Sequence, residues 1–310
     1  MMFPGQGSQS VGMLAGLAAA EPVVAATFAE ASTVLGYDLW QLCQSGPEER
    51  LGGTEYTQPA MLAAGVATWR AWLHRGGATP AMMAGHSLGE YSALVCAGAI
   101  DFTAAVGLVR ERGRLMQQAV PVGSGAMAAI LGLDDGTVEA ACAEVAGVEV
   151  VEAVNYNAPG QLVIAGHAPA VTRAMEACRA RGAKRAVLLP VSAPCHSSLM
   201  QPAAAALGER LAALSIEPPQ VRVRAFDASL YDSPESIRAG LYSQLFRPVR
   251  WSSIVTAMLG DGARVLMECG PGKVLAGLAR RVPGGREATV LALEGIESLD
   301  AARVAAGSAP

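Results

Sequence analysis

The 310-residue chain lacks several features that mark common classes of protein. Its six cysteines form no C-x-x-C pair and its four histidines do not cluster, which argues against a disulfide framework and against a zinc site. No uninterrupted apolar stretch reaches the roughly 18 residues that a membrane-spanning helix needs. The first residues, from Met1 to Gly7, contain neither a basic nor an apolar signal region. We therefore expect a cytoplasmic protein with no membrane segment.

The chain also lacks an excess of basic residues. It has 23 Lys and Arg against 27 Asp and Glu, which gives a formal net charge of −4. This balance provides no general attraction to nucleic acid or to anionic lipid, so we expect neither as a partner. An acidic protein partner would have to meet a local basic patch.

Short apolar segments alternate with alanine-rich helical patterns at both ends of the chain. Predicted strands at 81–84 and 263–267 are followed by predicted helices at 88–99 and 274–281, and another helix is predicted over 101–119. This alternation favours an α/β fold with a parallel sheet.

The middle of the chain has a different order, β-α-β-β-α-β, which is typical of a ferredoxin-like module. Its predicted elements are strand 126–133, helix 136–145, strands 148–154 and 161–166, helix 169–181 and strand 184–191. Turn-forming residues stand on either side, at 123–125 and 192–194. We predict a small subdomain at 125–192 inserted into a large one built from 1–124 and 193–310, with a ligand site between them.

A G-x-S-x-G sequence, Gly85 to Gly89, lies between a predicted strand and a predicted helix. This is the setting of a nucleophile elbow, in which glycines relieve crowding and the helix N-terminus favours a developing negative charge. Ser87 is therefore the candidate nucleophile. The alternative is a glycine-bounded turn in which Ser87 only caps the helix.

A serine nucleophile needs a base, and the candidates are His74, His86, His167 and His196. His74 ends a predicted amphipathic helix (60–75), where a cation has a structural role. His86 adjoins the nucleophile and should point away from it, whereas His167 follows a strand and should be solvated.

His196 lies where the chain is expected to return across the crevice between the subdomains. It is the candidate base, and the alternative is an ordinary loop histidine, because geometry decides which histidine can act. The neighbouring Cys195 is expected to be inert, since nothing near it would lower the thiol pKa.

Arg112 interrupts the apolar face of the predicted helix 101–119. The residues three and four positions away from it are Leu108, Val109, Leu115 and Met116. A charge on such a face needs a partner. A structural salt bridge or a side chain that reaches the surface would serve, but a bidentate substrate carboxylate fits the guanidinium fork.

Two glycine-containing loops, Gly5 to Gly7 and Gly270 to Lys273, lack the spacing of dinucleotide-binding and P-loop motifs. We therefore expect no nucleotide hydrolysis. The tail after Asp300 is rich in Ala, Gly and Ser and is expected to be frayed.

Taken together, an ordered set of segments resembles the malonyl-CoA:acyl carrier protein transacylase family of bacterial fatty-acid synthesis. The segments are Gly5 to Gln9, Gly85 to Tyr91, Arg112 to Gln117, Asn155 to Asn157, Pro194 to His196 and Gly270 to Lys273, within a resemblance that ends near Leu293. It implies a hydrolase-like parallel-sheet core with an inserted ferredoxin-like small subdomain. Family members carry several more apolar residues before the first glycine loop, so a start upstream of Met1 or a very short first strand is expected.

The resemblance also implies an activity and a set of roles. A malonyl group would pass from malonyl-CoA to Ser87 and then to the phosphopantetheine thiol of an acidic acyl carrier protein, without a cofactor or a metal. The implied roles are Ser87 as nucleophile, His196 as base, Arg112 as carboxylate clamp, the Gln6 and Leu88 amides as oxyanion hole, the Gln244 backbone carbonyl as the group that orients His196, and Gln58 as a residue lining the site.

Several readings stay open at this point. An esterase or thioesterase shares G-x-S-x-G, but that fold places its histidine late in the chain, and no histidine follows His196. A transferase of a polyketide synthase or of a malonate decarboxylase would use the same site, and a non-catalytic scaffold would not need it. We expect a monomer whose candidate basic docking residues are Lys184, Arg185, Arg280 and Arg281.

Overall fold

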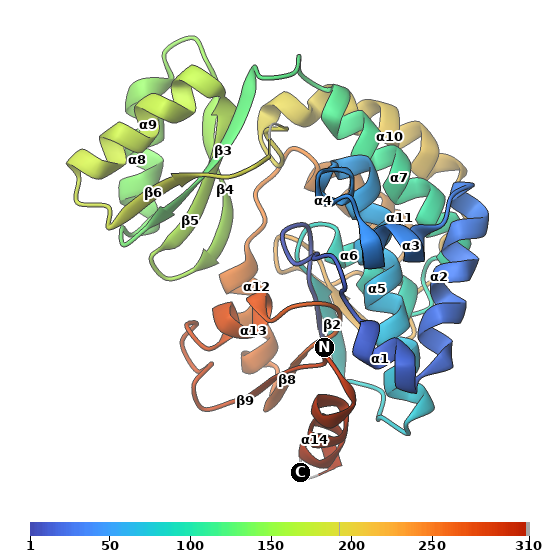
Figure 1. The fold of residues 1–310 in the computed structure, drawn as a ribbon. Coiled ribbons are helices and arrows are strands. Elements are labelled where there is room, and N and C mark those ends of the chain that lie inside the picture. Colours follow the sequence, from blue (N-terminus) through green and yellow to red (C-terminus); the bar gives the residue numbers. More distant parts are fainter. Residues whose placement is uncertain (192, 308–310) are drawn as a thin grey trace.

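The computed structural model describes residues 1–191 and 193–307. Within them the chain forms two lobes, a larger one around a parallel sheet and a smaller one around an antiparallel sheet (Figure 1). The mixed α/β fold class predicted from the sequence is confirmed.

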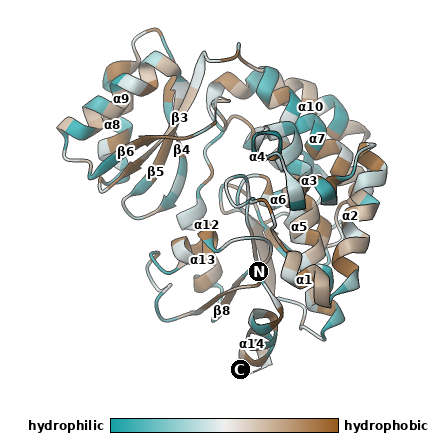
Figure 2. Ribbon diagram, in the orientation of Figure 1, coloured by the Kyte–Doolittle hydropathy of each residue, from teal (hydrophilic) through white to brown (hydrophobic). Residues whose placement is uncertain are grey.

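Five parallel strands form the sheet of the larger lobe. In spatial order they are β7 (Arg222–Arg224), β2 (Met82–Gly85), β1 (Met2–Phe3), β8 (Val265–Glu268) and β9 (Thr289–Ala292). Met2 pairs with Ala84 of β2 and with Glu268 of β8, so the shortest strand is the central one. Parallel strands are covered on both faces, and the brown colour of β8 in Figure 2 reflects its apolar sequence.

Helices surround this sheet on all sides. They are α1 (Ala15–Ala20), α2 (Pro22–Leu35), α3 (Leu39–Ser45), α4 (Glu48–Gly52), α5 (Thr54–His74), α6 (Gly89–Cys96), α7 (Phe102–Gln118), the 3₁₀ turn η1 (Ser198–Met200), α10 (Gln201–Ala213), α11 (Pro234–Gln244), α12 (Trp251–Gly260), α13 (Val274–Ala279) and α14 (Ile296–Gly307).

Helix α5 is the central helix of the larger lobe, and the prediction that it is amphipathic was wrong. Nearly all of its residues are buried, because α2, α6 and α7 pack around it. It also begins at Thr54, before the predicted start at residue 60, and so includes Gln58. A helix that is apolar all round is a core helix, and its few polar side chains must find partners inside the protein.

The smaller lobe has the strand order β4-β5-β3-β6, with all neighbours antiparallel. Its elements are β3 (Gly125–Leu131), α8 (Asp135–Ala146), β4 (Val151–Ala158), β5 (Gln161–His167), α9 (Ala168–Ala180) and β6 (Arg185–Leu188). Successive side chains of a strand point to opposite faces. In β3, Ala128 and Ile130 pack on α8 and α9, whereas Met127 faces the core of the larger lobe. Of the predicted boundary residues, 192 lies outside the described part of the chain.

Strand β4 lies several residues later than predicted. Gly147 has a positive φ of 59° and Val148 is fully exposed, so the chain is still turning there. At its far end, the backbone of β4 exchanges hydrogen bonds with Val249, which comes directly before α12 in the larger lobe. This contact attaches β4 to the larger lobe at Asn155, whereas the pairing of β4 with β5 continues to Ala158.

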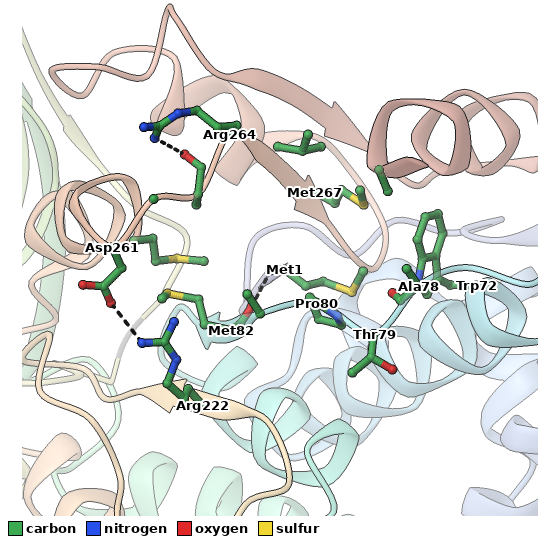
Figure 3. A pocket seen from close by; sticks show the side chains of 16 residues that line it. Met1, Trp72, Ala78, Thr79, Pro80, Met82, Arg222, Asp261, Arg264 and Met267 are labelled. Carbon is green, nitrogen blue, oxygen red and sulfur yellow. Dashed lines mark hydrogen bonds and ion pairs between the residues drawn. The ribbon is translucent and has the colours of Figure 1, made fainter. Parts of the chain in front are cut away.

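The start of β1 is buried in the sheet. The α-ammonium of Met1 donates to the carbonyl oxygen of Met82 at 2.8 Å, and burial lowers its pKa to about 5. A cavity of ≈440 Å³ lies beside it, lined by residues that include Met82 and Met267 (Figure 3). Strand β1 consists of two residues, Met2 and Phe3.

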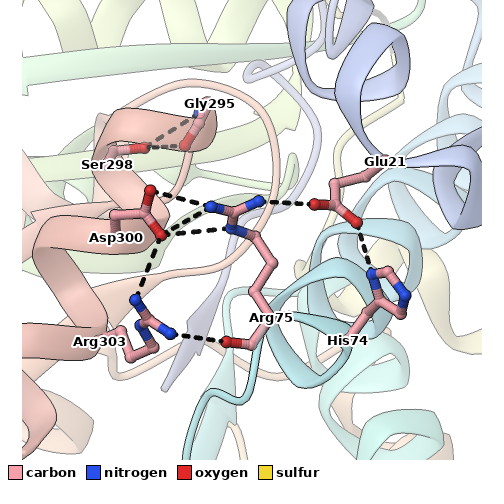
Figure 4. Close-up of polar contacts among 7 residues, drawn as sticks. All are labelled: Glu21, His74, Arg75, Gly295, Ser298, Asp300 and Arg303. Atoms are coloured by element: carbon pink, nitrogen blue, oxygen red, sulfur yellow. Dashed lines mark hydrogen bonds and ion pairs between the residues drawn. The ribbon is translucent and has the colours of Figure 1, made fainter.

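The C-terminal segment is helical over Ile296–Gly307, so the prediction of a frayed tail after Asp300 was wrong for residues 301–307. Leu299 and Ala302 of α14 are buried against the larger lobe. Asp300 accepts hydrogen bonds from Arg75, which also donates to Glu21 at 2.9 Å (Figure 4). These ion pairs join α14 to the end of α5 and to the start of α2.

Candidate active site

Ser87 lies on a sharp turn between β2 and α6. Its φ is +53°, in the left-handed region that non-glycine residues seldom adopt. The turn requires the two flanking glycines: a Cβ on Gly85 would lie 1.8 Å from the carbonyl carbon of Gly89, and one on Gly89 would lie 1.9 Å from the carbonyl oxygen of Phe3. The G-x-S-x-G pattern therefore reflects steric necessity at both ends, as a nucleophile elbow needs.

The first glycine loop packs directly on this elbow. A Cβ on Gly5 would lie 2.5 Å from the carbonyl oxygen of His86, so only glycine allows the two backbones to approach so closely. Gln6 and Leu88 consequently line the same cavity as Ser87. Neither of their backbone N–H groups has a hydrogen-bond acceptor among residues 1–191 and 193–307. Both donors are available to a bound oxyanion.

His196 is brought to Ser87 by the loop that follows the smaller lobe. Its Nε2 lies 2.8 Å from Ser87 Oγ, and its Nδ1 lies 2.7 Å from the backbone carbonyl oxygen of Gln244. A carbonyl can only accept, so Nδ1 carries the proton and Nε2 is the acceptor for the serine hydroxyl. Burial, reinforced by the positive charge of Arg112, lowers the pKa of His196 to about 3, so the ring is neutral near pH 7.

Arg112 of α7 reaches into the same site and is only 1% exposed. Its Nη1 donates to Gln58 Oε1 at 2.9 Å, and its Nη2 donates to Gln244 Oε1 at 2.8 Å and to Ser87 Oγ at 3.3 Å. Its Nε has no partner among the described residues. The cation is thus held by neutral amides, with one donor unused, and within the described ranges it forms no ion pair.

Gln244, at the end of α11, contacts nearly every part of this arrangement. Its backbone carbonyl orients His196, and its Oε1 accepts from Arg112. Its Nε2 donates to the backbone carbonyl of Ser87 at 2.9 Å and to Glu90 Oε2 at 2.8 Å. Sequence reasoning assigned a role only to the Gln244 backbone and missed its side chain.

Glu90 is a buried carboxylate that sequence reasoning missed altogether. It lies on α6, accepts hydrogen bonds from Gln244 and from the Tyr231 hydroxyl, and is fully buried. Burial raises its pKa to about 7, while these two hydrogen bonds oppose the rise. The sequence did contain a sign of this role, because a carboxylate three residues after Ser87 stands in a largely apolar predicted helix.

The smaller lobe contributes two asparagines from β4. Asn157 Oδ1 lies 2.8 Å from His86 Nε2, so His86 points away from the nucleophile as predicted. Asn155 lines the Ser87 cavity, and its buried Oδ1 has no partner among the residues described. Asparagine is disfavoured in strands, and two of them in a buried strand were a usable sign of function.

His74 and His167 make contacts away from Ser87, and the Cys195 thiol beside the site is protonated. His74 contacts Glu21 at 2.7 Å at the end of α5. His167 is only partly exposed, because its Nδ1 accepts from the backbone N–H of Val150, so the expectation of a solvated ring was only partly right. Cys195 lines the cavity, but burial raises its thiol pKa to about 11, which leaves it protonated.

Two cavities meet at this site. The inner one, ≈100 Å³, is lined by Ser87, His196 and Arg112 together with apolar side chains such as Met116. The outer one, ≈750 Å³, shares Gln6, His86 and Asn155 with it and extends between the lobes to Val274 and Leu278 of α13. A small acyl group fits the inner cavity, and a long flexible arm fits the outer one.

The four predicted docking residues are distributed unevenly. Lys184 and Arg281 line one cavity of ≈520 Å³ at the joint between the lobes. Arg281 donates to the carbonyl oxygen of Pro159 at 3.1 Å, and Arg280 donates to that of Val290. Arg185 is exposed on β6.

Comparisons with known proteins agree with this geometry. The family model described as acyl transferase domain matches residues 1–289. The chain is 57% identical over 282 residues to the malonyl CoA-acyl carrier protein transacylase of Escherichia coli (strain K12), covering 91% of each protein. It is 48% identical to the solved enzyme of that name from Coxiella burnetii, with a TM-score of 0.96 and coverage of 98% and 96%.

A further solved structure contains a related enzyme bound to a partner protein. This malonyl-transacylase, in complex with a type II polyketide acyl carrier protein, is 53% identical to the chain, with a TM-score of 0.97 and coverage of 98% of each chain. The matches span nearly the whole chain, including the elbow, the glycine loop and the smaller lobe. The chain therefore belongs to the acyl transferase domain family, among the malonyl CoA-acyl carrier protein transacylases.

Proposed function

We propose that this protein transfers a malonyl group from malonyl-CoA to the phosphopantetheine thiol of an acyl carrier protein, through an ester on Ser87. The observation that carries the proposal is the position of a buried arginine, Arg112, 3.3 Å from the serine hydroxyl that His196 contacts from another side. A nucleophile beside a fixed cation selects an acyl group that ends in a carboxylate.

In the first half-reaction His196 Nε2 accepts the proton of the Ser87 hydroxyl as its oxygen attacks the thioester carbonyl. The Gln6 and Leu88 amides donate to the oxyanion that forms, and these fixed donors favour the tetrahedral intermediate over the planar thioester. His196 then gives the proton to the departing CoA sulfur. The Gln244 carbonyl holds the ring in the required tautomer throughout.

The second half-reaction runs the same steps in reverse with a different thiol. The carrier thiol gives its proton to His196 and attacks the malonyl-serine ester, and Ser87 regains its proton as it leaves. All proton transfers use groups of the chain and its substrates, so the proposal includes no cofactor and no metal.

Selectivity follows from the environment of Arg112. A malonyl carboxylate can accept from its unused Nε, whereas an acetyl group would leave the buried donor unpaired. The outer cavity, with apolar side chains of α13 opposite amides of β4, suits a phosphopantetheine arm. The carrier is an acidic protein in this proposal, and Lys184 and Arg281 at the joint between the lobes are the basic side chains that would meet it.

The proposal includes supply of malonyl units to fatty-acid synthesis. Polyketide synthesis is a second destination, because a malonyl-transacylase solved with a type II polyketide carrier protein is so similar to this chain.

Intact-protein mass spectrometry tests the function directly. Incubation with malonyl-CoA should add one malonyl group to the protein, and peptide mapping should find it on Ser87. Acyl carrier protein should then remove the group and acquire it, whereas Ser87→Ala should form no adduct. Rapid release of free malonate without carrier protein would instead identify a thioesterase.

A further inference from the structure

Arg112 has an unusual environment for a buried cation. Besides Ser87, its side-chain acceptors among the described residues are two amide oxygens, those of Gln58 and Gln244. A half-turn of a side-chain amide exchanges the positions of its oxygen and its NH2 group. An amide can therefore face a guanidinium with its acceptor or with its donors. The direction of the Gln244 amide therefore decides whether it supports or repels Arg112.

Glu90 determines that direction. Both N–H donors of the Gln244 amide are used, one by the Ser87 carbonyl and the other by Glu90 Oε2 at 2.8 Å. Glu90 Oε2 is the acceptor in this contact, so it binds the nitrogen end of the amide and leaves the oxygen end toward Arg112. The other carboxylate oxygen of Glu90 accepts from the Tyr231 hydroxyl, a contact separate from the one to Gln244.

Glu90 touches neither Ser87 nor His196 through its side chain, and the cavity that holds both of them is not lined by it. Its position behind the elbow gives it influence on the site without contact with an acyl group. Gln244 is also the residue whose backbone carbonyl orients His196. One residue thus connects the base, through its backbone carbonyl, with the cation and the buried carboxylate, through its side-chain amide.

We propose that Glu90 is a positioning residue which, by fixing the amide of Gln244, directs the Arg112 guanidinium and so sets the preference for carboxylated acyl groups. The inference rests on the proposed function, because it takes Arg112 as the group that binds the malonyl carboxylate. A role in folding alone would affect all acyl groups equally, whereas a role through Arg112 affects only those with a free carboxylate.

The test compares kcat/KM for malonyl-CoA and acetyl-CoA in the original protein and in variants of Glu90 and Tyr231. Glu90→Met keeps a long buried side chain but removes the acceptor, and the malonyl-to-acetyl ratio should fall about tenfold or more, the range of one hydrogen bond to a charged group. Glu90→Gln keeps an acceptor oxygen and should restore the ratio to within about threefold of the original. Tyr231→Phe leaves the Gln244 contact in place and should not change the ratio.

The outcomes are decisive in either direction. Equal losses for both acyl groups in Glu90→Met, or an equally large fall of the ratio in Tyr231→Phe, would overturn the inference. If Glu90→Met does not fold, Glu90→Asp carries the test, since its shorter carboxylate withdraws from Gln244, and an unchanged ratio refutes the role. Arg112→Ala in parallel, together with the Ser87 adduct measurement, separates the two proposals. Absence of the adduct refutes the proposed function, and an unchanged ratio in Arg112→Ala refutes the carboxylate clamp. A ratio that changes in Arg112→Ala but not in the Glu90 variants refutes the role of Glu90.

Discussion

Replacement of Arg112 by alanine should weaken malonyl transfer far more than acetyl transfer. The substitution removes a guanidinium whose Nη1 and Nη2 bind Gln58 and Gln244 and whose Nε is unused. It leaves two buried amide oxygens without their donor, and this cost falls on both acyl groups alike. Only the malonyl group loses a bond to its own carboxylate.

The size of the differential effect follows from that bond. A hydrogen bond to a charged group contributes about 1.5–3 kcal/mol. At about 1.4 kcal/mol for each factor of ten, the malonyl-to-acetyl ratio of kcat/KM should fall by about 10- to 150-fold. Arg112→Lys keeps a charge but loses the planar fork, so its ratio should lie between those of the alanine variant and the original protein.

The assay measures transfer to acyl carrier protein from malonyl-CoA and from acetyl-CoA at the same enzyme concentration. Arg114→Ala is the matched control, because Arg114 lies on the same helix but bonds only Glu111 and Gln118 on the surface. Its ratio should not change. Equal losses for the two substrates in Arg112→Ala, with an unchanged thermal midpoint, would refute the assignment of Arg112 as the carboxylate clamp.

Two further predictions concern pH. His196 acts as a base only when neutral, and its pKa is lowered to about 3. In Glu90→Gln, where residue 90 cannot titrate, kcat/KM should therefore stay constant as the pH falls through 6.5. A fall of kcat/KM with a midpoint at pH 6.5 in that variant would contradict the lowered pKa of the buried histidine. The Met1 ammonium has its pKa lowered from 8.0 to about 5, so its contribution to stability is complete above pH 8 and is lost as the pH falls toward 5, by about 4 kcal/mol. Urea denaturation of a chain that begins at Met1 should show this loss, and the Nα-acetylated form should not; identical pH dependence of both forms would count against burial of the amino group.

The local features of the site could be read from the sequence because each has a local cause. Gly85 is required by a backbone clash within the elbow, and Arg112 stood out because its neighbours on the helix are apolar. The β-α-β-β-α-β order follows from hydrophobic periodicity, which depends only on nearby residues.

Errors arose where distant segments decide the outcome. The burial of α5 depends on three helices that surround it, and the helical tail buries Leu299 and Ala302 against the larger lobe and pairs Asp300 with Arg75, far away in the chain. The position of β4 depends on its pairing with β5 and on its bridge to Val249 of the other lobe. None of these partners can be identified from the periodicity of the segment itself.

The sequence by itself determined the kind of chemistry: a serine on an elbow, four histidines as possible bases and a cation on an apolar face, because residue type and short spacing carry that information. Only the tertiary structure decided which groups meet. It placed His196 Nε2 2.8 Å from Ser87 Oγ, and it joined Glu90, Gln244 and Arg112, residues from three separate helices, into one hydrogen-bonded chain. Hydrogen bonds act over about 3 Å, so their partners are fixed by how the whole chain packs rather than by its local pattern.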